Sequence, residues 1–228
     1  METVRLLVCI ALAVPCGALI ARVSDGFISE RPLFQPSESP KVSPRTLAIV
    51  VVTMVSFVLV AWRFSEGTWF ELLAYLAGFG ALLLASVIDI TEYRLPDAVV
   101  IPSLSVGLLL VIVGSIVDQS PERMQFAFAG GLLAFGVLLV AHVISPQGMG
   151  FGDVKFAALL GVMVGWQASS FVDVVLLVLW LLLIGFAFGA VGGVTLMVLR
   201  GRNRPFPFGP FLALGTLLTV VLSRALVG

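Results

Sequence analysis

Charged residues are scarce in this chain. Only 11% of its 228 residues are Asp, Glu, Lys or Arg, whereas 60% are hydrophobic and the mean hydropathy is +1.14. This composition excludes a soluble globular domain, because too few polar side chains are present to cover the surface of one. The sequence therefore predicts an all-α, polytopic integral membrane protein in contact with the lipid bilayer.

The chain also has no net charge, no CxxC pair of cysteines and only one histidine. The 13 basic and 13 acidic residues cancel, which excludes a strongly basic protein that binds nucleic acid. Cys9 and Cys16 form no CxxC motif, so we interpret them as packing residues rather than a zinc or redox site. His142, the single histidine, is interpreted as a packed or interfacial residue. We predict no metal and no cofactor.

Eight apolar stretches approach the length needed to cross about 30 Å of hydrocarbon. The first imitates a secretory signal, but more spans follow it, and Pro15 before Cys16 disfavours a lipoprotein cleavage site; we interpret it as a retained span. The sixth is short and begins inside a glycine-rich motif, so we expect it to be tilted or partly unwound. The stretches are about 4–22, 46–63, 68–89, 97–117, 125–144, 154–167, 171–199 and 207–227.

One sizeable loop, from about 23 to 45, is rich in proline and serine, which favours an irregular polar linker. We divide the chain into two N-terminal spans with this linker, residues 1–67, and a membrane domain, residues 68–228. In the seventh span, the spacing Gly185-xxx-Gly189 allows a second helix to approach closely, and we favour packing within the fold over dimerisation.

Basic residues are distributed unequally between the two sets of loops. If the N-terminus lies outside, nine are cytoplasmic and four are external. Because Lys and Arg favour cytoplasmic loops, this count predicts the orientation and places Asp89 and Asp153 at the cytoplasmic face. The cytoplasmic set is Arg22, Arg31, Lys41, Arg45, Arg94, Lys155, Arg200, Arg202 and Arg204, and the external set is Arg5, Arg63, Arg123 and Arg224.

Asp89 and Asp153 are ionisable residues at the ends of apolar spans, which indicates a functional site. Two carboxylates at one depth can share a proton and activate water for peptide hydrolysis. Alternate glycines before Asp153 let a substrate or a helix approach closely; the alternative is a glycine-rich loop with a charged helix cap. The motifs are Ser86-Val87-Ile88-Asp89-Ile90-Thr91-Glu92-Tyr93-Arg94-Leu95-Pro96-Asp97 and Gly148-Met149-Gly150-Phe151-Gly152-Asp153-Val154-Lys155.

Residues beside the two aspartates have simpler interpretations. Pro96 is expected to begin the next helix, where its missing N–H costs nothing. Asp97 either interacts favourably with the positive N-terminal end of that helix or contacts the substrate. Lys155 is either an interfacial anchor or a positive charge that favours ionised Asp153. Three further carboxylates are predicted on the opposite side of the membrane, unable to join the pair: Asp118, Glu122 and Asp173.

From about residue 68 to its C-terminus, the chain resembles the type IV prepilin peptidases, membrane aspartic proteases of the GxGD group. Gly150-Phe151-Gly152-Asp153 is similar to the motif that names the group, and Asp89…Leu95-Pro96-Asp97 to the first aspartate motif of the family. Pro207-Phe208-Gly209-Pro210 is similar to the family's entry to its last helix. The resemblance implies that Asp89 and Asp153 are catalytic, with substrate-binding or structural support from Gly150, Gly152, Lys155, Pro96, Asp97, Pro207 and Gly209.

The same resemblance implies an enzyme of the bacterial inner membrane that cuts the short basic leader from prepilins or pseudopilins at the cytoplasmic face, without a metal. Larger members carry a cysteine-containing cytoplasmic domain after the first span, which is associated with N-methylation. The loop at 23–45 has no cysteine and is too short for that domain, so the resemblance supports leader cleavage and not methyl transfer.

Two other functions fit the membrane carboxylates less well. One is a GxGD protease similar to signal peptide peptidases or presenilins, against which the Asp89 motif and the Pro207–Pro210 segment argue. The other is a proton-coupled transporter, but transporters often have two similar halves with broken helices, and this sequence shows no such symmetry.

Overall fold

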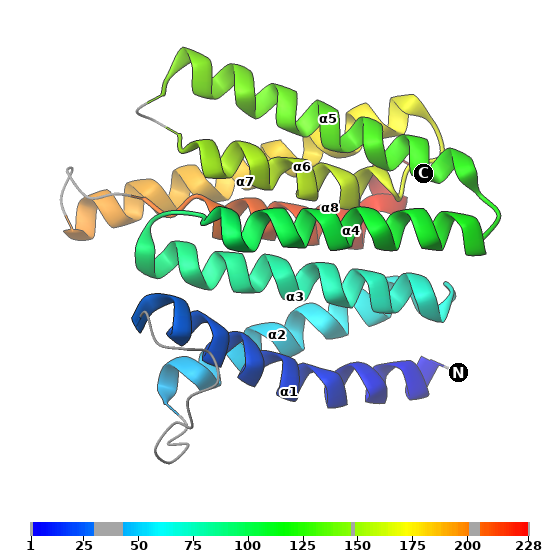
Figure 1. Cartoon of the computed structure of the whole chain (residues 1–228), viewed down its shortest axis with the longest axis horizontal. Coiled ribbons are helices and arrows are strands. Elements are labelled where there is room, and N and C mark those ends of the chain that lie inside the picture. The colour runs from blue at the N-terminus through cyan, green and yellow to red at the C-terminus, as the bar shows by residue number, and fades with distance from the viewer. Residues whose placement is uncertain (1, 30–42, 147–148, 201–205, 228) are drawn as a thin grey trace.

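The computed structural model describes residues 2–29, 43–146, 149–200 and 206–227. Within these ranges the chain forms eight α-helices and no strand, which confirms the predicted all-α class (Figure 1). The helices are α1 (Glu2–Ser29), α2 (Pro44–Arg63), α3 (Trp69–Glu92), α4 (Asp97–Val117), α5 (Pro121–Ile144), α6 (Phe151–Gly165), α7 (Phe171–Arg200) and α8 (Gly209–Val227).

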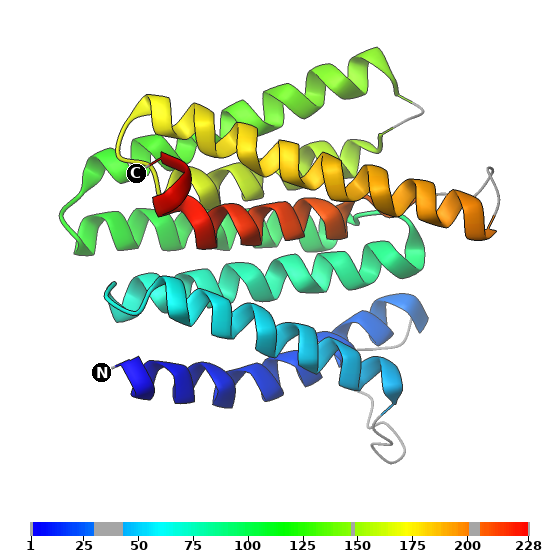
Figure 2. The same cartoon turned by 180° about the vertical axis from the view of Figure 1, so that it is seen from behind.

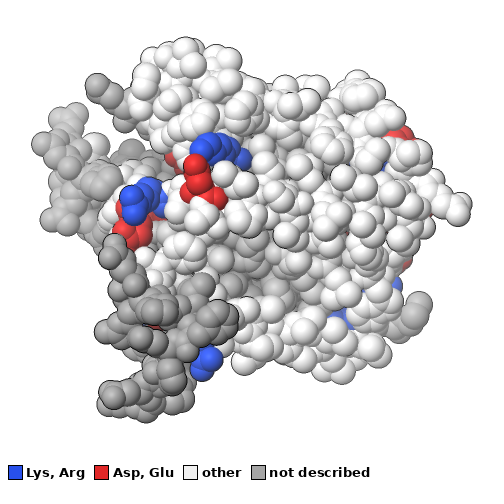
Figure 3. Space-filling view, viewed as in Figure 1, with Lys and Arg blue, Asp and Glu red and all other residues white. Residues whose placement is uncertain are grey.

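The helices run alternately in opposite directions. One end of the bundle, called the motif end below, holds the C-terminal ends of α1, α3, α5 and α7 and the N-terminal ends of α2, α4, α6 and α8; the start of α1 and the end of α8 lie at the other end (Figure 1, Figure 2). On the face drawn in Figure 3, charged side chains gather towards the ends and leave a broad uncharged belt between them. This distribution is that of a bundle inserted in a bilayer.

Seven of the described helices are long and apolar enough to span a membrane, which confirms a multi-pass membrane protein. The exception is α6, whose 15 residues measure about 22 Å at 1.5 Å per residue. It packs against α4, α5, α7 and α8, and its side chains are mostly buried, among them Phe156, Leu160 and Val164. A short helix surrounded by longer ones needs no contact with lipid. The expected shortness is confirmed, and α6 is a continuous helix, without the partial unwinding that was one of the two expectations for it.

Helix α1 is longer than the sequence predicted. The irregular linker was expected from residue 23, yet α1 continues to Ser29. Its last turns stay packed against the start of α2, where Asp25 pairs with Arg45 at 2.5 Å and Ser24 is fully buried. Hydropathy marks where an apolar stretch stops rather than where a helix stops, which explains the difference. Residues 30–42, with Pro32, Pro36, Pro40, Arg31 and Lys41, lie outside the described residues, as do Gly148, Arg202 and Arg204.

Glycines permit close contacts between helices in the bundle. A Cβ on Gly185 would lie 3.1 Å from the Leu212 side chain, and one on Gly189 would lie 2.8 Å from Phe208, so this face of α7 packs within the fold, against α8 and the residue before it. Between α5 and α6, a Cβ on Gly130 would overlap the Gly161 carbonyl. These contacts fix α6 and α8, the helices whose N-termini adjoin the two aspartates.

Candidate active site

Asp89 lies in the last turns of α3 and is buried, with only 4% of its surface exposed. The helix ends three residues later, at Glu92. The next residue, Tyr93, adopts a left-handed backbone conformation (φ 54°), and its N–H donates to the Asp89 carbonyl at 2.8 Å. The Asp89 carboxylate faces the start of α8, because Oδ2 accepts a 2.8 Å hydrogen bond from the Gly209 N–H. The first N–H groups of a helix lack partners within it, so this hydrogen bond also gives one of the first N–H groups of α8 an acceptor.

Gly209 gives the Asp89 carboxylate room to reach the α8 backbone. A Cβ at this position would lie 2.9 Å from Oδ2 of Asp89, closer than a carbon and a carboxylate oxygen normally approach. The preceding Pro207 is buried, and the Phe208 carbonyl accepts the N–H groups of Phe211 and Leu212 as the helix begins. Gly209, singled out from the sequence as a support residue, therefore contacts the Asp89 carboxylate. Pro207, the other support residue in this segment, lies two residues before Gly209.

Asp153 lies in the first turn of α6 and is half-buried. Gly150 caps the helix in an extended conformation (ψ 146°), and its carbonyl accepts the Asp153 N–H at 3.1 Å. The Asp153 carboxylate lies near Gly150, where a Cβ would be 3.4 Å from Oδ2. The described part of the glycine-rich motif thus starts α6 and adjoins its carboxylate.

Leu95, in the α3–α4 connection, links the surroundings of the two aspartates. Its side chain is buried, and a Cβ on Gly152 would lie 2.9 Å from the Leu95 carbonyl oxygen, while one on Gly209 would lie 3.5 Å from Leu95 Cδ1. Gly152 precedes Asp153 and Gly209 binds Asp89, so one leucine contacts both neighbourhoods. The backbone segments of the two aspartate motifs therefore both adjoin Leu95.

Lys155 joins α6 to α4. Its ammonium group lies 2.8 Å from both carboxylate oxygens of Asp97 and 5.1 Å from the centre of the Phe151 ring. Asp97 is the first residue of α4, and Pro96 occupies the capping position just before it. The charge of Lys155 is thus paired with Asp97 rather than with Asp153.

His142 contributes to the site in a way the sequence did not predict. At the end of α5, its Nδ1 lies 2.8 Å from the carbonyl oxygen of Met149, and its ring lies 5.5 Å from that of Phe151. A carbonyl only accepts, so Nδ1 carries the proton. His142 is packed, as expected, but what it packs against is the segment that leads into Asp153.

No three His, Cys, Asp or Glu side chains gather into a potential metal site in the described part of the chain. Three carboxylates lie at the opposite end of the bundle, as predicted: Asp118 after α4, Glu122 in the first turn of α5, and Asp173 in that of α7. There Arg123 pairs with Glu71 at 2.5 Å and with Asp118 at 3.5 Å. These groups are a bundle length away from Asp89 and Asp153.

Comparison with known proteins places the chain in a family. The profile of the type IV leader peptidase family matches residues 76–194, just over half of the chain, including both aspartates. Proteins named prepilin leader peptidase/N-methyltransferase are similar to it in Aeromonas salmonicida (strain A449), with 32% identity over 76% of this chain and 56% of the relative, and in Pseudomonas putida, with 34% identity over 79% and 60%.

A third relative with that name, from Pseudomonas aeruginosa, is 36% identical over 68% of this chain and 50% of its own length. The chain thus spans only about half to three fifths of the length of these relatives. No solved structure matches it significantly. The family profile, which covers both aspartate motifs, shows that the chain belongs to the type IV leader peptidase family.

Proposed function

We propose that this protein is a membrane aspartic endopeptidase that removes the short basic leader from prepilins or pseudopilins. The observation that carries the proposal is the meeting of the two motifs. Asp89 is buried and held by the Gly209 N–H, and the backbone that precedes Asp153 is packed against the same Leu95 that contacts Gly209. Family membership supports the same reaction.

Each carboxylate has a defined part in the proposed reaction. A water molecule between Asp89 and Asp153 loses a proton to one carboxylate as its oxygen attacks the peptide carbonyl carbon, and the other, protonated carboxylate donates its proton to the carbonyl oxygen. The tetrahedral intermediate then expels the amine as its nitrogen takes up a proton from the pair. The Gly209 N–H fixes the Asp89 carboxylate throughout, since the bond is made by backbone at a helix start.

The proposed orientation has the motif end in the cytoplasm of a bacterial inner membrane. The described basic residues divide between the two ends as the sequence grouped them: Arg22, Arg45, Arg94, Lys155 and Arg200 are near the motif end, and Arg5, Arg63, Arg123 and Arg224 are near the other. A basic leader that remains in the cytoplasm would then reach both aspartates. The proposal covers cleavage alone and includes no methyl transfer.

The experiment is co-expression of the full chain with a candidate prepilin, followed by leader removal on a gel and N-terminal sequencing of the product. We expect a single cut at the junction between the basic leader and the apolar helix. Glu92→Gln, which changes an exposed carboxylate three residues from Asp89, serves as the matched control and should cut equally well. An intact prepilin in the presence of normally inserted protein would contradict the proposal.

A further inference from the structure

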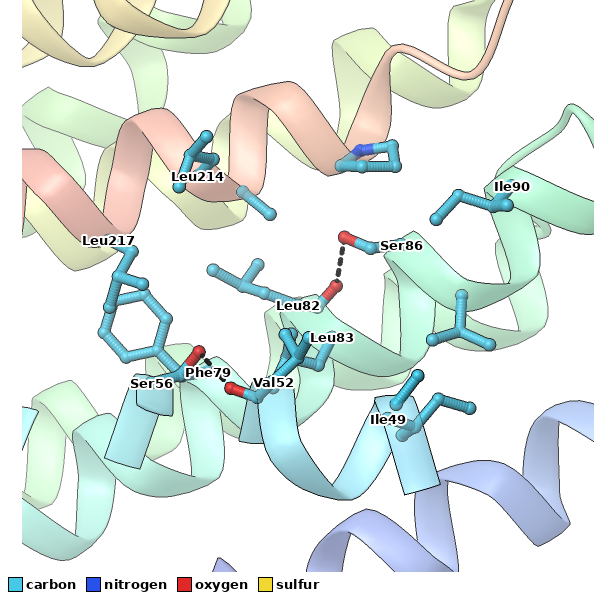
Figure 4. Close-up of a pocket in the computed structure, with 14 residues that line it drawn as sticks. Ile49, Val52, Ser56, Phe79, Leu82, Leu83, Ser86, Ile90, Leu214 and Leu217 are labelled. Carbon is cyan, nitrogen blue, oxygen red and sulfur yellow. Dashed lines mark hydrogen bonds between the residues drawn. The ribbon is translucent and has the colours of Figure 1, made fainter. Parts of the chain in front are cut away.

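An apolar hollow lies beside the candidate active site. It has a volume of about 370 Å³ and is enclosed by α2, α3 and α8 (Figure 4). Phe79, Leu82 and Leu217 line its buried part, and Val52 and Leu83 stand at its more exposed margins. We call this hollow the trough.

The trough is about as long as three turns of a helix. Its lining on α3 runs from Phe79 to Ile90, which corresponds to about 16 Å or three helical turns. On α8 the lining residues recur at intervals of three and four, from Pro210 to Leu217. Such stripes form the ridges between which the side chains of another helix pack.

The lining offers nothing to a polar ligand. Of its 14 residues, only Ser56 and Ser86 carry a polar side chain, and none is charged. The Ser56 hydroxyl donates to the Val52 carbonyl at 2.9 Å, and the Ser86 hydroxyl donates to the Leu82 carbonyl at 2.7 Å (Figure 4). Both donors are therefore already used within their own helices, and an occupant must be apolar.

One end of the trough meets the candidate active site. Ile90 is the residue after Asp89, and Pro210 is the residue after Gly209, whose N–H holds the Asp89 carboxylate. From that end the trough runs along α3 towards the middle of the bundle. An apolar helix lying in it would begin beside Asp89 and continue into the depth of the bilayer.

We infer that the trough is the binding groove for the first three turns of the apolar helix of the substrate. The inference rests on the proposed function, because that substrate class has an apolar helix directly after the bond that is cut. Packing in the trough would place the polar-to-apolar junction at Asp89 and would prevent the chain from sliding. The trough thereby selects which peptide bond reaches the two carboxylates.

Cysteine cross-linking tests the occupant directly. In a background of Cys9→Ala and Cys16→Ala, single cysteines replace Val87 and Leu214, both half-buried in the trough wall, and Leu132 on the exposed face of α5 as the control. Each is combined with Asp153→Asn to retain the substrate and with a prepilin carrying one cysteine four residues into its apolar helix. We expect adducts of enzyme and prepilin from Val87→Cys and Leu214→Cys, and at least tenfold less from Leu132→Cys.

Three outcomes would overturn the inference: equal adducts from the control position, adducts only between two copies of this chain, or reaction of the trough cysteines only with a lipid analogue. As an independent measurement, Val87→Trp should raise the KM for prepilin at least tenfold with a smaller change in kcat, whereas Val140→Trp, on the exposed face of α5, should change neither. An unchanged KM in Val87→Trp would also overturn it. If the unmodified protein cuts no prepilin, the proposed function fails; if it cuts while the trough variants behave as the controls, only the trough assignment fails.

Discussion

At the scale of single residues, the candidate site depends on places where a side chain is absent. Gly209 and Gly152 each lie so close to another part of the chain that a Cβ would meet it at 2.9 Å, the Asp89 carboxylate in one case and the Leu95 carbonyl in the other. Gly150 differs, because a Cβ there would make an ordinary contact, 3.4 Å from Asp153. The glycines of the second motif therefore have unequal roles.

Gly152→Ala is expected to lower the rate of leader cleavage roughly tenfold to a hundredfold. The added methyl group must push α6 away from Leu95, and overpacking of this kind costs about 1–3 kcal/mol, which is enough for such a fall if it misplaces Asp153. Kinetics of the purified variant on a prepilin measure the effect. The loss should exceed that of Ala at Gly131 or Gly189, which pack α5 against α6 and α7 against Phe208, and Gly80→Ala, where a Cβ meets nothing within 4 Å, should be neutral. Activity within about twofold of the unmodified protein would show that Gly152 only shapes a loop.

His142 is expected to act through its Nδ1 proton on the segment that leads into Asp153. His142→Phe keeps a ring but loses the donor, and one hydrogen bond of about 1 kcal/mol corresponds to roughly a fivefold fall in kcat. In His142→Asn the side-chain amide can occupy the position of Nδ1, so kcat should return to within about twofold. Equal losses in the two variants, with equal thermal stability, would mean that the ring contact rather than the hydrogen bond matters.

At the scale of helices, Lys155 and Asp97 connect the N-termini of α6 and α4 through a partly exposed ion pair. Exposed pairs contribute about 0.2–1 kcal/mol, so Lys155→Gln and Asp97→Asn should each lower kcat/KM by no more than about fivefold. The double variant should be no worse than either single one, because both break the same contact. A much larger loss in Lys155→Gln than in Asp97→Asn would indicate that the ammonium group acts on Asp153 itself.

Helix positions were largely predictable from the sequence, because apolar stretches of membrane length have few alternatives to a helix. The fourth stretch, 97–117, coincides with α4, and the seventh, 171–199, falls one residue short of α7. The end of α1 was not predictable, since Asp25 and Arg45 are held by a contact between two helices. The same reason applies at the site: Asp89 and Asp153 were identified from motifs, but the Gly209 bond and the Leu95 contact join residues far apart in the chain.

At the scale of the whole molecule, the alternation of helices puts Glu92 and Glu122 at opposite ends of the bundle, both exposed. In a background without Cys9 and Cys16, Glu92→Cys and Glu122→Cys should therefore react with a membrane-impermeant thiol reagent from opposite sides. Glu122→Cys is expected to react in intact cells and Glu92→Cys only after the membrane is opened. Reaction of both from the same side would contradict the eight-helix arrangement, and the reverse sidedness would contradict the cytoplasmic placement of the motif end.

The central claim is that Asp89 and Asp153 act together as one catalytic pair. The most direct measurement is kcat/KM for prepilin cleavage by Asp89→Asn, Asp153→Asn and the double variant, each inserted at normal levels. Asparagine keeps the size of the side chain but cannot exchange the shared proton, so each single variant should lose at least about a hundredfold. The double variant should be no worse than either, because the two residues act as a unit. Near-normal leader removal by either single variant would contradict the claim.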